Sequence, residues 1–289
     1  MKQNATPQTP PIVLTFAASD PTGGAGIQAD LMTLSAMGCH ALSVLTALTV
    51  QDTAGVDRVL AIDSEWVEDQ ARALLEDMPV AAFKIGLLGS VENIAAIADI
   101  LSDYPNIPVV LDPVLASGRG DELANDEIIY AMRELLLPQT TVLTPNTFEA
   151  SRLVHDEEDE EGGGEGGSHA ETPPLIECAR RLLGFGCEYV LLTGTHDATV
   201  QVVNTLYGEH GVVRRDTWDR LPGSYHGSGC TLASAVAACL ANGLPVPDAV
   251  REAQDYTWQA LAAGFRPGMG QYIPDRFFWA RRPSEDENS

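Results

Sequence analysis

A glycine turn followed by a cysteine is the segment of this chain best suited to chemistry. His226, Gly227, Ser228, Gly229 and Cys230 run directly into an Ala-rich stretch that predicts a helix over 229–240. A Gly-x-Gly turn at a helix start points several backbone N–H groups at one place, where the helix dipole adds partial positive charge. The sequence therefore predicts an anion hole for a phosphoryl group in transfer. Cys230 falls in the first turn, where a thiolate is favoured; the alternative is a free cysteine packed as a small hydrophobe.

A second glycine-rich segment spans Ser19 to Asp30, between a predicted first strand and a predicted first helix. Glycines there permit tight backbone turns and the close approach of a ligand. The segment lacks the G-x-G-x-x-G pattern, and the chain contains no G-x-x-x-x-G-K-[ST] pattern, so the dinucleotide fingerprint and the P-loop are both missing. The spacing alone leaves two interpretations open, a ligand-binding turn and a structural one.

These segments must be positioned by alternating strands and helices. Apolar β-type runs predict strands at 12–16, 42–48, 80–85, 109–111, 142–144 and 189–193, and a hairpin at 200–206 and 211–214. Helical patterns occur at 25–37, 64–75, 91–101, 126–137, 147–154, 172–183, 229–240 and 246–263. The alternation predicts an α/β fold with a central, mostly parallel sheet and helices on both faces. A ligand is expected beyond the carboxyl ends of the strands, where Asp20, Lys84, Asp112, Asn146 and Thr193 collect.

The chain is expected to form one domain over 12–280, preceded by a disordered stretch at 1–11 and followed by a flexible tail at 281–289. Residues 155–171 interrupt the pattern with an acidic run and a glycine run. Such a segment cannot bury apolar area and repels itself, so we expect a mobile acidic insertion. A Ca²⁺ site is the alternative, but glycine repeats do not hold ligands in fixed geometry.

The overall charge limits the classes of partner that the protein can bind. The chain carries 17 Lys and Arg against 41 Asp and Glu, a formal net charge of −24. That balance argues against nucleic acid or an anionic membrane as partner, although a basic pocket for a nucleotide remains compatible with it. Five cysteines without C-x-x-C spacing argue against zinc and a disulfide framework. With a polar N-terminus and no apolar run of roughly 18 residues, a cytoplasmic protein is expected.

Five segments in order resemble those of one kinase family. The two glycine-rich segments, together with 83–88, 110–114 and 143–150, are similar to the ribokinase-like fold and, within it, to the hydroxymethylpyrimidine/phosphomethylpyrimidine kinases of thiamine biosynthesis, over about 12–265. The resemblance implies transfer of the γ-phosphoryl of ATP to 4-amino-5-hydroxymethyl-2-methylpyrimidine and then to its monophosphate. It also implies Mg²⁺ as cofactor and a homodimer.

The family's functional residues can be placed residue by residue. Cys230 stands where most ribokinase-type sugar kinases have an Asp base, and Gly227 and Gly229 would form the anion hole beside it. The remaining assignments that the resemblance implies are Asp112 and Glu149 for the metal, Asn146, Thr193 and Ser228 for the nucleotide, and Gln51, Gly24, Asp30 and Leu87 for the substrate. An amide such as Gln51 offers a donor and an acceptor together, the complement of an amino group beside a ring nitrogen. A turn cap before Pro113 is the alternative for Asp112, and a surface side chain for Gln51.

One position departs from the family. Many relatives have a Lys near the nucleotide where this chain has Thr193, which carries no charge. His226 lies near enough in sequence to reach the site, or it caps the helix; Lys84 is either a site residue or a structural ion-pair partner. Two rival functions follow: a pyridoxal or pyridoxine kinase of vitamin B6 salvage, and a non-catalytic pyrimidine-binding relative.

Overall fold

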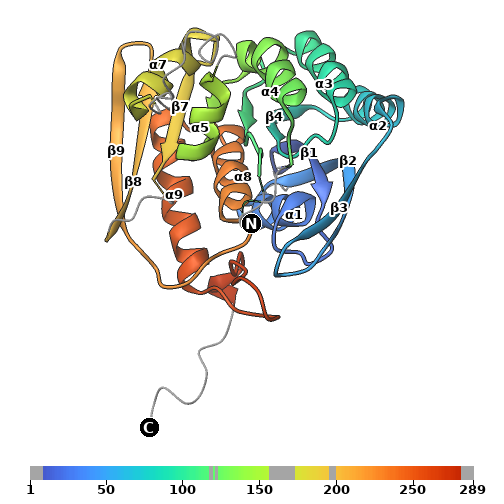
Figure 1. Ribbon diagram of the computed structural model, residues 1–289. Coiled ribbons are helices and arrows are strands. Elements are labelled where there is room, and N and C mark those ends of the chain that lie inside the picture. The colour runs from blue at the N-terminus through green and yellow to red at the C-terminus, as the bar shows by residue number, and fades with distance from the viewer. Residues whose placement is uncertain (1–8, 117–119, 121–122, 156–172, 195–199, 281–289) are drawn as a thin grey trace, which may run out of the picture.

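A single twisted sheet runs through the computed structural model (Figure 1). The structure describes residues 9–116, 120, 123–155, 173–194 and 200–280. Within them, nine strands lie in the order β3-β2-β1-β4-β5-β6-β7-β8-β9. The strands are β1 Ile12–Ser19, β2 His40–Gln51, β3 Val56–Ala61, β4 Val80–Ile85, β5 Val109–Leu111, β6 Val142–Leu143, β7 Tyr189–Thr193, β8 Gln201–Gly208 and β9 Gly211–Asp219. β2, β1, β4, β5, β6 and β7 are parallel, whereas β3 at one edge and β8 and β9 at the other are antiparallel.

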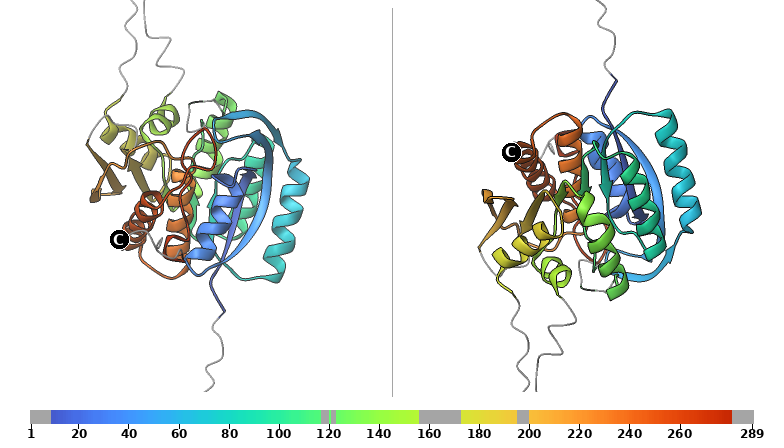
Figure 2. Two further views of the ribbon diagram at one scale, coloured as in Figure 1. Left: turned by 90° about the horizontal axis from the view of Figure 1, so that it is seen from below. Right: turned by 90° about the horizontal axis from the view of Figure 1, so that it is seen from above.

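Helices cover both faces of this sheet, as the α/β pattern predicted (Figure 2). They are α1 Gly26–Ala36, α2 Ser64–Asp77, α3 Val91–Asp103, α4 Asp126–Ala131, α5 Thr147–Val154, α7 Leu175–Gly184, α8 Ser228–Ala241 and α9 Val246–Ala262. α1, α8 and α9 pack on one face, and α2 to α5 with α7 pack on the other. Successive side chains of β1 point to opposite faces of the sheet, so two cores form. Leu14 and Phe16 face α2 to α5 and α7, while Val13 faces α8.

The observed elements include one strand that was not predicted and one predicted helix that is interrupted. β3 was not predicted, because it is an edge strand whose residues are mostly exposed and whose sequence lacks an apolar alternation. The helix predicted at 126–137 is α4 followed by a π turn, Met132–Leu136, and a 3₁₀ turn, Leu137–Gln139. Pro138 explains the change, since it lacks an N–H group and its ring crowds the preceding turn.

The expectations for the ends and the insertion fall largely on residues outside the described ranges, namely 1–8, 156–172 and 281–289. Pro11, within the predicted N-terminal stretch, is tied to the sheet because its carbonyl accepts a hydrogen bond from the His40 N–H at 2.9 Å. All five cysteines are free thiols. None of the helices in the described ranges has the length and apolar character needed to cross a membrane.

The two glycine-rich segments lie directly against each other. Gly227 has a φ of +80°, and a Cβ built on it would overlap the carbonyl oxygen of Gly24. The buried Arg276 fastens the contact, because its guanidinium donates to the carbonyl of Gly23 at 3.3 Å and to Thr231 Oγ1 at 3.1 Å. The turn after β1 and the start of α8 are therefore held as one unit.

We predict that Gly227→Ala destabilises the protein far more than Gly243→Ala. Both glycines have positive φ, which costs a side-chain-bearing residue about 1–2 kcal/mol, but a Cβ on Gly243 meets no atom within 4 Å. The overlap with Gly24 should add about 1–3 kcal/mol at Gly227. Urea denaturation of the two variants measures the difference; equal losses would show that the close approach is not a constraint.

Candidate active site

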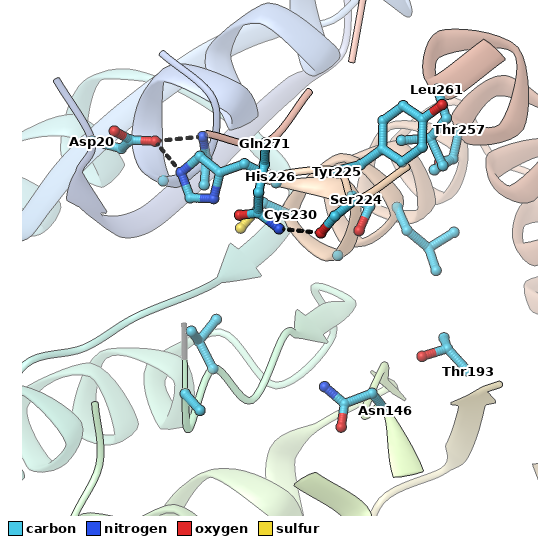
Figure 3. A pocket seen from close by; sticks show the side chains of 18 of the residues that line it. Asp20, Asn146, Thr193, Ser224, Tyr225, His226, Cys230, Thr257, Leu261 and Gln271 are labelled. Carbon is cyan, nitrogen blue, oxygen red and sulfur yellow. Dashed lines mark hydrogen bonds and ion pairs between the residues drawn. The ribbon is translucent and has the colours of Figure 1, made fainter. Parts of the chain in front are cut away.

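A cavity of about 430 Å³ opens at the carboxyl ends of the parallel strands. Figure 3 shows two walls: Asp20, His226 and Cys230 lie on one side, and Asn146 and Thr193 face them from the other. The first wall comes from the turn after β1 and the start of α8, and the second from the ends of β6 and β7. The sheet edge predicted from the sequence is thus the one that is hollowed.

Most of the predicted site residues meet here. Those that line the cavity are Gln51, Leu87, Asn146, Glu149, Thr193, Gly227, Ser228, Gly229 and Cys230. Gly24 and Asp30 do not line it, although both were predicted to contact substrate. Gly24 is buried beneath the His226 ring, and Asp30 is wholly buried beneath the cavity floor. Asp112 lies directly behind Gly229, whose ideal Cβ would sit 3.6 Å from its Oδ1.

The start of α8 lies at the cavity, where the sequence predicts an anion hole. Gly227 is the N-cap and has no side chain with which to cap the helix, so the first-turn N–H groups remain directed outward at the cavity lining. The half-buried Cys230 follows, and its thiol lies close to the Asp112 carboxylate. Burial and the negative charge of Asp112 raise the pKa of this thiol to about 12, despite the nearby Lys84. The expectation of a thiolate is therefore wrong for the ligand-free site: the helix dipole is outweighed, and the thiol is neutral.

Asp112 and Glu149 form a pair of buried carboxyl groups. Burial raises the pKa of Asp112, and burial together with the charge of Asp112 raises the pKa of Glu149 to about 8. Asp112 Oδ2 is buried without a hydrogen-bond partner. No group of three His, Cys, Asp or Glu side chains in the described ranges is arranged to hold a metal. Two carboxylates with an unsatisfied oxygen suit Mg²⁺, which takes its other ligands from water and phosphate.

The opposite wall is built by a capping box at the start of α5. Asn146 Oδ1 accepts from the Glu149 N–H, and Glu149 Oε2 accepts from the Asn146 N–H, both at 2.9 Å. Because its oxygen is committed to the cap, Asn146 can offer its amide nitrogen, a donor, to a phosphate oxygen. Thr193 pairs with Asn146 in an isolated bridge, and its hydroxyl lies 3.5 Å from the Pro145 carbonyl.

Asp30 and Lys84 form a fully buried ion pair under the site. Lys84 Nζ donates to Asp30 Oδ2 at 2.9 Å, and Thr15 and Ser234 donate to the same carboxylate at 2.7 and 2.8 Å. Burial would lower the pKa of Lys84, but the negative charges of Asp30 and Asp112 raise it. Of the two interpretations of Lys84 that the sequence left open, the structural ion-pair partner is confirmed; Lys84 is also among the residues that line the cavity.

Three residues that the predicted set lacked also shape the cavity. His226 Nε2 lies 2.8 Å from Asp20 Oδ2, and Arg220 lines the cavity beside Gly194, whose carbonyl its guanidinium approaches at 3.4 Å. His226 could have been predicted from its place directly before the glycine turn, and Asp20 from its place at the end of a predicted strand. Arg220 could not, because the predicted strand stopped at residue 214, short of the observed end of β9.

Comparison with known proteins agrees with this geometry. The family model described as phosphomethylpyrimidine kinase matches residues 20–275. A hydroxymethylpyrimidine/phosphomethylpyrimidine kinase of Streptomyces coelicolor is 41% identical over 270 residues, which cover 91% of this chain and 93% of the relative. The solved phosphomethylpyrimidine kinase of Clostridium difficile 630 superposes with a TM-score of 0.70 at 32% identity, covering 87% of this chain and 99% of that one. The pyridoxal kinase of Staphylococcus aureus, solved with AMP-PCP and pyridoxal, gives a TM-score of 0.80 at 28% identity, covering 95% and 96%.

These likenesses, with the sheet order and the glycine-cysteine turn, define a ribokinase-like small-molecule kinase. The chain belongs to the phosphomethylpyrimidine kinase family.

The buried Glu149 should leave a signature in the pH dependence of stability. Its pKa is about 8 in the folded protein, against an ordinary 4.5. Between these values only the folded state holds the proton, so the stability of the metal-free protein should fall as pH rises, by up to about 1.4 kcal/mol per unit. Glu149→Gln, which keeps an acceptor for the Asn146 N–H, should reduce that slope. Urea denaturation in EDTA from about pH 5 to 8 tests this; identical slopes in both proteins would contradict it.

Proposed function

We propose that this protein transfers the γ-phosphoryl group of ATP to 4-amino-5-hydroxymethyl-2-methylpyrimidine and then to its monophosphate, in thiamine biosynthesis. The observation that carries the proposal is a single cavity lined by the Gly227–Cys230 turn, Glu149 and Gln51, with Asp112 directly behind Gly229. The three parts match the three needs of phosphoryl transfer: a site for the transferred group, a site for a divalent cation and a site for the acceptor.

The proposed roles follow from where the groups lie. The α8 N–H groups stabilise charge on the transferred phosphoryl group, and the acceptor hydroxyl lies beside Cys230. A neutral thiol is a poor base, so Cys230 acts chiefly in holding and orienting that hydroxyl; phosphoryl transfer depends more on position and charge than on a strong base. Asp112 and Glu149 would hold Mg²⁺, which neutralises phosphate charge when bound. Asn146, Ser228 and Thr193 would contact the nucleotide.

The pyrimidine is favoured over pyridoxal as acceptor. The relatives that cover nine-tenths of the chain at 36–41% identity carry the pyrimidine-kinase name, whereas the pyridoxal kinase of S. aureus is 28% identical. We also propose a cytoplasmic homodimer; it rests on the resemblance alone, and a light-scattering mass near that of one chain would contradict the dimer.

The first experiment offers the purified protein Mg-ATP with hydroxymethylpyrimidine, its monophosphate and pyridoxal in separate reactions, with products resolved by mass. We expect turnover of both pyrimidines and slow turnover of pyridoxal; a preference for pyridoxal, or no turnover in a folded sample, would overturn the proposal.

Cys230→Ala should lower kcat at least tenfold while ADP binding persists. Cys239→Ala, on the same helix but buried away from the cavity, is the matched control. Wild-type kcat in Cys230→Ala would remove the cysteine from the reaction.

Arg220 is proposed to supply the charge that Thr193 lacks. Within the described ranges, Lys84 and Arg220 are the Lys and Arg side chains that line the cavity, and the side chain of Lys84 has no exposed surface. The guanidinium of Arg220 is next to Gly194, one residue beyond Thr193, on the wall where Asn146 stands. A planar guanidinium can bind two phosphate oxygens at once, so it can replace a lysine at a nucleotide.

Arg220→Ala should therefore raise the KM for ATP about tenfold, in keeping with the loss of one charge-assisted contact, while the KM for the pyrimidine changes less than about twofold. Arg220→Lys should recover part of the loss. Arg215→Ala removes an exposed arginine of β9, the strand that ends directly before Arg220, and should leave both constants near wild type. Steady-state kinetics with each substrate varied decides the matter; an unchanged KM for ATP in Arg220→Ala would exclude the contact.

A further inference from the structure

The imidazole of His226 connects three separate parts of the site. Its Nε2 atom lies 2.8 Å from Asp20 Oδ2, in the turn after β1, and 3.2 Å from the amide nitrogen of Gln51, at the end of β2. The next residue is Gly227, the N-cap of the anion-hole helix. Figure 3 shows the ring turned toward Asp20 at the cavity wall.

The contact with Asp20 decides where the proton of the ring resides. Although burial acts to raise the pKa of Asp20, hydrogen bonds from His226, the Ala25 N–H and Thr22 lower it to about 2. Asp20 is therefore a carboxylate that can only accept, and a ring nitrogen 2.8 Å from it must carry a hydrogen. Nε2 of His226 is a donor, whether the ring is neutral or charged.

The donor at Nε2 has a consequence for Gln51. An amide nitrogen and a protonated ring nitrogen are both donors and cannot bond at 3.2 Å. A half-turn of the amide exchanges two atoms of nearly equal size and brings Oε1 to the ring, where it shares the one Nε2 hydrogen with Asp20 in a three-centre hydrogen bond. Gln51 lines the cavity, so its amide nitrogen, turned away from the ring, is left to meet a ligand, and the ligand atom that meets it must be an acceptor.

The surroundings hold this arrangement in place. The His226 backbone N–H donates to the Tyr272 carbonyl at 2.8 Å. Gly24 leaves the space that the ring occupies, since any Cβ there would collide with the imidazole. Asp20 is itself fixed by the N–H groups of Thr22 and Ala25, at 2.8 and 2.7 Å. The histidine has little freedom to turn and release the amide.

We propose that His226, held by Asp20, is a positioning residue that fixes the orientation of the Gln51 amide and thereby selects acceptor rings with a hydrogen-bond-accepting nitrogen. The inference rests on the proposed function for the identity of the ring, and it goes further by assigning specificity to a residue that touches Gln51 and not the reacting atoms. It also sharpens the role of Gln51, whose nitrogen becomes the contact for the ring.

The test compares how strongly each enzyme variant discriminates among substrate analogues. kcat/KM is measured for hydroxymethylpyrimidine and for two pyridine analogues in which each ring nitrogen in turn is replaced by C–H. In the wild type, one replacement should cost at least tenfold, the range expected when a buried donor loses its partner. In His226→Phe, which fills the space without donating, the same replacement should cost less than about threefold. His226→Gln, which can donate to both Asp20 and Gln51, should restore the discrimination.

Each outcome is decisive. A merely structural histidine would lower activity on all three compounds by one factor and leave their ratios unchanged in His226→Phe, which would overturn the proposal. ADP binding to each variant, measured by calorimetry, is the control that the nucleotide-binding wall of the cavity is intact. If His226→Phe does not fold, His226→Asn replaces it, because its side chain is too short to reach Asp20. A wild type that phosphorylates none of the compounds would instead reject the proposed function itself, and with it the inference.

Discussion

The site depends on one buried ion pair. Asp30 from α1 and Lys84 from β4 have no exposed surface, and Thr15 of β1 and Ser234 of α8 complete the hydrogen bonding of the carboxylate. Removing one partner of such a pair leaves an uncompensated charge and costs about 3–5 kcal/mol, whereas the intact pair adds little net stability. The ion pair instead fixes positions, because it joins α1, β4, β1 and α8 around the Asp30 carboxylate. The floor of the site is therefore fixed before any ligand enters.

The same pair sets the electrical character of the cavity. Asp112 and Glu149 lie above it, and the pKa of each is raised because burial disfavours a second and third negative charge in one place. Lys84 partly offsets them and is already committed to Asp30. A site with this surplus of carboxylate repels a bare nucleotide and attracts a divalent cation, so a metal–nucleotide complex is the ligand form that the charges favour.

Features determined by neighbouring residues could be predicted, and features determined by distant pairing could not. The predicted helix at 147–154 has the observed bounds of α5, because its capping box is encoded by Asn146 and Glu149, three residues apart. β3 was missed since its strand character comes from pairing with β2, not from its own pattern. The bond between Asp20 and His226 joins residues 206 positions apart, and no spacing signals it.

Asp30 shows why the site could be predicted only in part from the sequence. Its type and its place in a glycine-rich segment suggested substrate contact, but whether a helix residue points up into a cavity or down into a core depends on how α1 rotates against β1 and α8. That rotation is set by packing of residues such as Ile27 and Leu34, on which the motif gives no information. The helix start at the Gly227–Cys230 turn, by contrast, is made of local backbone and could be predicted directly from the sequence.

The high pKa of Cys230 bears on the chemistry of oxidants. Only the thiolate of a cysteine reacts readily with peroxides and alkylating agents, and burial beside Asp112 keeps this thiol protonated. The cavity thus has a sulfur atom in its lining that is not a redox sensor. Under oxidative stress, the empty enzyme should keep its cysteine reduced where a cysteine activated by a helix dipole alone would be lost.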